Sequence, residues 1–163
     1  MGVRTLALLG ILGAAAMAGA GETAVYEVEI DCTWSNATHP GAFPFAAHLS
    51  WFGGATHSDA VSFWEAGELA SPGMKEMAET GATLILVGTE VQAALDAGTA
   101  HEAIEHRHWF CPPETVHGSC GDLTFEIEAT ASHDKVTLVS MLGPTPDWFV
   151  GVSGLSLRDG GEW

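Results

Sequence analysis

Two stretches in which apolar and polar residues alternate constrain the fold of this chain most. Residues 124–130 read Thr-Phe-Glu-Ile-Glu-Ala-Thr, and residues 26–30 read Tyr-Glu-Val-Glu-Ile at the start of a segment that runs up to Trp34. A repeat of two places apolar side chains on one face of a β-strand and polar side chains on the other. Residues 136–142 and 148–157 are also rich in strand-forming residues and are separated by turn residues. The sequence therefore predicts β-structure at both ends.

Helix signals lie between these strands. Ser71 is followed by a proline, a pair typical of an N-cap and the first helical position, and the predicted helix stops at Gly81. A second helical stretch begins near Thr89, pauses at Gly98 and is predicted to continue over residues 100–106.

The segment 39–73 is rich in glycine, proline, histidine and aromatic residues without a steady period. We expect it to be an ordered segment without regular secondary structure, stabilised by packing of its aromatic side chains. Strands at both ends with helices between them favour a mainly β protein, an antiparallel β-sandwich with a short helical insertion, over alternating βαβ units.

Residues 1–20 have the pattern of a secretory signal peptide. They carry one basic residue, Arg4, then an apolar run over residues 6–18 and a small-residue triplet at 18–20. The run is shorter than the roughly 18 to 20 residues that span a bilayer, and no other window approaches that length. We therefore expect a secreted, extracellular or periplasmic protein that does not span the membrane, with residues 21–163 as its single functional domain.

The domain is strongly acidic. Setting aside Arg4 leaves 5 − 1 = 4 basic residues against 21 acidic ones, a formal charge of 4 − 21 = −17. Such a charge disfavours nucleic acid as a partner. The excess acid either keeps the protein soluble or includes carboxylates that neutralise a bound cation.

The three cysteines all follow the predicted signal peptide, in a compartment where disulfides persist. Cys111 and Cys120 bracket a polar loop rich in proline and glycine, and we predict a local disulfide between them. Cys32 is then either a small buried apolar residue or bonded to a partner outside this chain.

Histidines and glutamates gather over residues 101–108, which read His-Glu-Ala-Ile-Glu-His-Arg-His. A zinc-protease helix needs two histidines four residues apart, whereas His101 and His106 are five apart and would point about 140° from each other on a helix. His101, Glu105 and His108 have helical one-face spacing, so a secreted metal-dependent hydrolase is an alternative hypothesis. The sequence has no serine nucleophile elbow and no phosphate-binding glycine loop, so we expect a protein that is not an enzyme.

The segment 144–152 reads Pro-Thr-Pro-Asp-Trp-Phe-Val-Gly-Val. Its two prolines stiffen a turn and place Asp147 at the mouth of the following strand. A carboxylate there either binds calcium or caps the turn.

This segment resembles the signature of the spondin N-terminal domain, a family found in F-spondin, mindin and secreted bacterial proteins. The resemblance extends in the family's order from residue 26 to residue 157, through the pieces at 33–35, 38–40, 43–44, 48–50, 54–57, 62–64 and 69–73. It implies a C2-like antiparallel β-sandwich and a calcium-binding role in extracellular adhesion or recognition, without catalytic residues.

The resemblance also implies the metal ligands. The family's ligand aspartate matches Asp147, and its ligand glutamate falls on Glu128, with Glu126 as the alternative if the register shifts by two. A further family ligand lies in a Tyr-Asp-Ala-Gly-like segment downstream, and this sequence ends at Trp163 before such a segment. We therefore expect either a domain incomplete at its C-terminus, or a Ca²⁺ site completed by backbone carbonyls and water.

A shared ion sets a condition on the strands. In a plain three-stranded meander over residues 123–157, Glu128 and Asp147 would be offset by about five residues, or about 16 Å. A shared ion therefore predicts that these strands cross between the two sheets. The leading hypothesis is a secreted calcium-binding module that recognises an unidentified extracellular protein, glycan or lipid; a further hypothesis is an interaction module without an ion.

Overall fold

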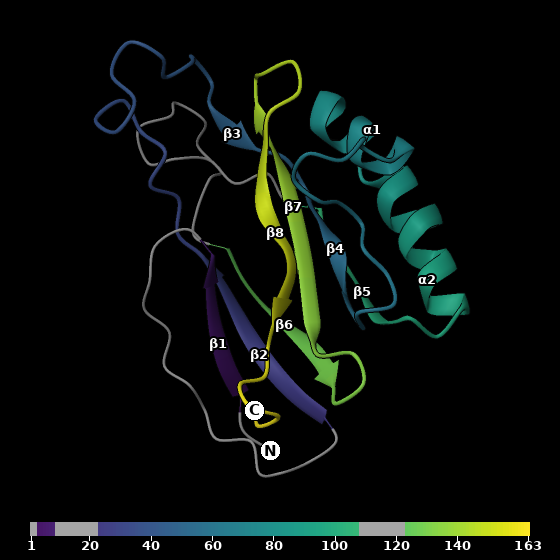
Figure 1. The fold of residues 1–163 in the computed structure, drawn as a ribbon. Helices are drawn as coiled ribbons and strands as arrows, with labels where there is room; N and C mark the ends of the chain where they lie inside the picture. Colours follow the sequence, from purple (N-terminus) through teal and green to yellow (C-terminus); the bar gives the residue numbers. More distant parts are fainter. Residues whose placement is uncertain (1–2, 9–22, 108–122) are drawn as a thin grey trace.

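Three layers make up the protein: a small β-sheet, a larger β-sheet, and helices on the far side of the larger sheet (Figure 1). The computed structural model of the chain describes residues 3–8, 23–107 and 123–163. The mainly β fold with antiparallel sheets and a short helical insertion is confirmed. No helix in the described ranges is long and apolar enough to cross a membrane.

The small sheet contains the two alternating stretches. Strand β2 (Thr23–Ile30) pairs antiparallel with β6 (Leu123–Thr130) along its whole length. Every second residue of each strand is buried, as the alternation predicts, because these side chains face the larger sheet.

Strand β1 (Val3–Leu8) lies on the other edge of β2 and is parallel to it. It falls within the predicted signal peptide at residues 1–20, which stays a prediction. Removal of that peptide would take β1 away and leave the outer edge of β2 open.

The larger sheet is organised around β7 (Lys135–Gly143). Strand β8 (Phe149–Ser156) pairs with one edge of β7, and the other edge pairs with β4 (Phe52–His57) and, further along, with the short β3 (His48–Leu49). Strand β5 (Ala100–His106) pairs with the far edge of β4. Six consecutive residues of β7 are buried, because the sheet is covered on both faces.

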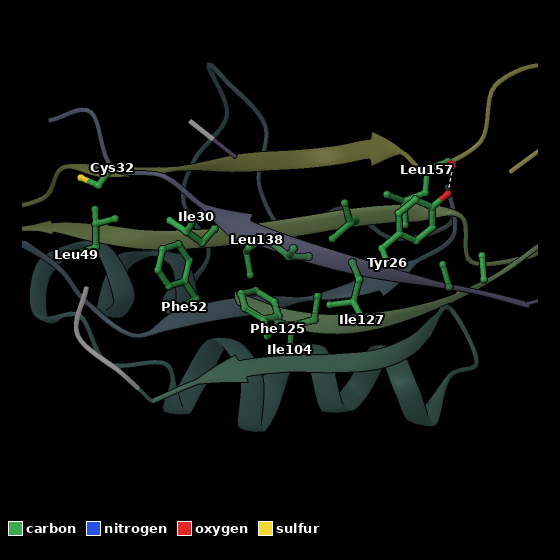
Figure 2. Packing of buried hydrophobic residues seen from close by; sticks show 14 residues of the cluster. Tyr26, Ile30, Cys32, Leu49, Phe52, Ile104, Phe125, Ile127, Leu138 and Leu157 are labelled. Atoms are coloured by element: carbon green, nitrogen blue, oxygen red, sulfur yellow. Dashed lines mark hydrogen bonds between the residues drawn. The ribbon is translucent and has the colours of Figure 1, made fainter. Parts of the chain in front are cut away.

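The first core lies between the two sheets (Figure 2). Tyr26 and Ile30 from β2 and Phe125 from β6 pack against Phe52 and Leu138 of the larger sheet. The Tyr26 hydroxyl donates a hydrogen bond to the carbonyl of Leu157, so it ties the small sheet to the end of β8.

The second core lies between the larger sheet and the helices. Helix α1 (Pro72–Thr80) starts at Ser71, whose side chain accepts a hydrogen bond from Met74 N, and ends at Gly81 with φ 73°, as predicted. The π-helix η1 (Leu86–Val91) continues into α2 (Gln92–Asp96), which confirms the helix expected near Thr89. Buried helix residues such as Met77 and Leu86 pack against Val139 of β7.

The helical continuation over residues 100–106 is wrong: this segment is strand β5. Gly98 has φ 68°, a left-handed conformation that ends the helix, and the chain then enters the sheet beside β4. Ala100 and Ile104 are the buried residues of β5, a spacing of four that occurs in both helices and strands.

The irregular interpretation of residues 39–73 is also wrong in part, because β4 is an inner strand of the larger sheet. Its first residues after Phe52 are Gly53 and Gly54, which weaken any strand signal. Gly54 has a packing reason: a Cβ at this position would lie 1.9 Å from the carbonyl oxygen of Thr137 on β7.

We predict that Gly54→Ala destabilises the protein by about 2 kcal/mol or more, because β4 and β7 must separate to admit the methyl group. Gly88→Ala is the matched control, since a Cβ there meets only Leu84 Cδ1 at 3.6 Å, and helical alanine is expected to be neutral or stabilising. Urea unfolding of both variants checks this; equal stabilities would contradict the close approach of β4 to β7.

Candidate functional site

Glu128 lies near the end of β6 and forms a side-chain hydrogen bond with β5. Its Oε1 is 2.9 Å from Nε2 of His101, with the side chains 44% and 30% exposed respectively. The backbone carbonyl of Glu128 accepts a hydrogen bond of 2.9 Å from the hydroxyl of Thr56 on β4. Both ends of the residue are thus already engaged with the larger sheet.

Further polar side chains surround this pair. The Glu102 carboxylate accepts a hydrogen bond from the backbone N–H of Glu128. The pKa of Glu102 is raised overall, chiefly because the carboxyl is buried. The hydrogen bond from Glu128 N–H lowers this pKa, and the nearby Glu128 carboxylate raises it. His101 stacks on His133 at 5.8 Å between ring centroids. We call His101, Glu102, Glu128 and His133 the β5–β6 cluster.

Asp147 lies on the surface in the loop between β7 and β8. The turn is capped by Thr145, whose hydroxyl donates to Leu142 O and accepts from Trp148 N. Because Thr145 fills the capping role that we considered for Asp147, the carboxylate of Asp147 is available to bind something else.

The structure does not bring Glu128 and Asp147 together. Thr56, which is bonded to Glu128, pairs with Val136 at the start of β7, whereas the last β7–β8 pair before the Asp147 loop is Met141 with Phe149. The five residues from 136 to 141 span about 17 Å at about 3.3 Å per residue. The predicted crossing between sheets is present, since β6 and β7 belong to different sheets. However, the two carboxylates lie at opposite ends of β7, too far apart for one calcium ion.

Glu126, the alternative ligand, is exposed on β6 opposite Glu27 of β2. It lies two residues from Glu128 on the same strand face, the face that points away from the first core. It therefore belongs to the small sheet and not to the β7–β8 loop.

The structure does not bring His101 and Glu105 of the alternative hydrolase site together either. Because β5 is a strand, His101 and Glu105 are about 13 Å apart along it. Glu105 is bonded to the hydroxyl of Thr83 and, at 3.0 Å, to Nε of Arg107. His108 lies outside the described residues. Within the described ranges, no group of three or more His, Cys, Asp and Glu side chains is arranged to hold a metal ion.

Cys32 is buried in the first core, as one of its two expected roles requires. Cys111 and Cys120 lie outside the described residues, so their disulfide stays a prediction.

A cavity of about 620 Å³ adjoins Asp147, and sequence reasoning missed it. It lies between α1, the segment 64–70 and the β7–β8 loop, with Trp64, Leu69, Met74 and Phe149 among its lining. Its only sequence signal is the mixture of apolar and acidic residues in segment 64–70, which carries no period.

His57 is a structural histidine at the end of β4. Because the Ser58 carbonyl can only accept, Nδ1 of His57 is the donor to it at 2.9 Å, and Nε2 accepts from the Thr137 hydroxyl at 2.8 Å. Burial lowers the pKa of His57, while the Ser58 carbonyl raises it less. This agrees with a hydrogen-bonding role for this histidine.

The chain matches the Spondin_N family model over residues 24–163. Spondin-2 of Homo sapiens is 32% identical over 166 residues, which cover 96% of this chain and 48% of that protein. Spondin-1 of Rattus norvegicus is 31% identical over 137 residues, which cover 83% of this chain and 16% of that protein. The chain belongs to the Spondin_N family, and it spans less than half the length of these relatives.

We predict that the free energy of unfolding falls as the pH drops through about 6.5, partly because of His57. The sign follows from its lowered pKa: below the unfolded-state pKa the unfolded chain binds the proton more tightly than the folded protein does. Burial lowers the pKa of His106 as well, so a His57→Gln variant should lose part of the dependence and not all of it.

The control is His39→Gln, because His39 is exposed in the loop after β2. Urea unfolding between pH 5 and 8 provides the comparison. An equal pH dependence in the native protein and the His57→Gln variant would show that His57 is not held neutral by the fold.

Proposed function

We propose that this chain is a secreted recognition module of the spondin type, which acts by binding an extracellular partner and not by catalysis. The Spondin_N match over residues 24–163 carries the proposal. The signal-peptide pattern of residues 1–20 and the acidic composition support an extracellular location.

A binding role is also supported by the separation of the chemically capable residues. His101 is paired with Glu128, and Glu105 is bonded to Thr83 and Arg107, so these side chains stabilise contacts between elements. The proposed partner is an extracellular protein, glycan or lipid.

Calcium binding is the second part of the proposal, and we place it at the Asp147 end of the protein. The described residues do not fit an ion shared by Glu128 and Asp147. We assign calcium to the β7–β8 loop, where the exposed Asp147 is not used as the turn cap and loop carbonyls are near in sequence. The ion would stiffen this loop for recognition.

Calorimetric titration with calcium separates this assignment from a shared site. Asp147→Asn should weaken calcium binding by about tenfold or more, since the carboxylate ligand of the loop is lost. Glu128→Gln should leave the affinity unchanged. Equal losses in both variants would contradict the assignment, and the absence of binding heat in the native protein would defeat the calcium proposal.

Export is tested by mass spectrometry of the protein recovered outside the cytoplasm of an expressing bacterium. The signal-peptide pattern predicts that the exported chain starts at Gly21, without β1. A chain that retained Met1 would show instead that Val3–Leu8 is a permanent edge strand of the small sheet.

A further inference from the structure

The cavity beside α1 is built from parts that are held in place before any ligand arrives. The Trp64 ring packs edge-on against Phe149 of β8, with centroids 5.2 Å apart. The carbonyl of Trp64 accepts hydrogen bonds from the hydroxyls of Ser62 and Ser153. Met74 of α1, which is 2% exposed, also lines the cavity. A wall of this kind loses little conformational entropy when a ligand binds.

The outer wall is a turn with an exposed apolar tip. Glu68 N donates to Glu65 O at 3.2 Å, and Gly67 between them has φ 93°, which favours glycine. Leu69 follows the turn, lines the cavity and is nevertheless 99% exposed. The mouth of the cavity is therefore apolar on the side of this turn.

The charge of the cavity is strongly negative. Four carboxylate residues line it, Glu65, Glu68, Glu79 and Asp147, against a single cation, Lys75, so the formal charge is 1 − 4 = −3. Lys75 is 3.9 Å from Glu79, an ion pair within α1. Charges of one sign around a concave apolar surface attract a cation and repel phosphate-bearing lipids and nucleic acids.

We propose that this cavity binds an arginine or lysine side chain that lies beside an apolar residue in an extended segment of a partner protein. The basic group lies beside the carboxylates of Glu65 and Glu68, which take no part in the calcium assignment, and the apolar neighbour covers Leu69 and the ring of Trp64. An aromatic wall suits the stem and head of a basic side chain. This inference goes beyond the proposed function, because it names a ligand class and does not require calcium.

The test uses two capped tripeptides as probes in buffer with EDTA, so that loss of calcium binding does not affect the result. The first is acetyl-Leu-Arg-Leu-amide, and the second replaces arginine by citrulline, which has nearly the same shape and no charge. NMR titration of the full chain should show the arginine probe shifting amides of residues 64–70, 74–79 and 147–149. The citrulline probe should bind roughly fivefold more weakly.

The double variant Glu65→Gln, Glu68→Gln should weaken the arginine probe by roughly fivefold and leave the citrulline probe unchanged. The control Glu29→Gln, Glu126→Gln removes the same charge from exposed positions on the small sheet and should change neither affinity. Leu69→Ser should weaken both probes. Equal binding of the two probes, equal effects of the two double variants, or shifts elsewhere in the protein would each overturn the proposal.

Discussion

The burial of β7 on both faces is the constraint on which the rest of the structure depends. Val136 and Leu138 contribute to the core shared with the small sheet, whereas Val139 and Met141 contribute to the core beneath the helices. Both edges of the strand are also paired, with β8 on one side and with β3 and β4 on the other. Burial of this kind stabilises both layers at once, so a change in β7 affects every element of the protein.

The length of the same strand separates the two ends of the molecule. Glu128 lies near the start of β7, because it is bonded to Thr56, which pairs with Val136. Asp147 lies beyond the other end of β7. The β5–β6 cluster is a set of polar contacts that joins the two sheets, whereas the Asp147 end combines an available carboxylate with an apolar, acidic cavity. Recognition is therefore proposed at the hairpin end, and the other end is assigned a structural role.

The sequence predicted elements whose signals are local. The alternation in residues 124–130 and the cap residues Ser71 and Gly81 located β6 and α1, because period and capping depend on neighbours along the chain. Strand β4 was not predicted, because Gly54 is explained only by the close approach of Thr137 from β7. Residues 100–106 were predicted as a helix, because their strand conformation depends on pairing with β4, which is distant in the sequence. The site residues Glu128 and Asp147 were predicted from the family resemblance, and the family itself is confirmed. The resemblance could not give the distance between the two residues, because that distance depends on the whole length of β7.

The most direct test of this account is a crystal structure of the protein grown with millimolar calcium. The account predicts that the His101–Glu128 hydrogen bond is intact, and that any bound ion lies at the β7–β8 loop, bound by Asp147 at about 2.3 to 2.6 Å and not by Glu128. A single ion bound by both Glu128 and Asp147 would contradict it, because β6 and the β7–β8 loop would then have to meet at the same end of the sandwich.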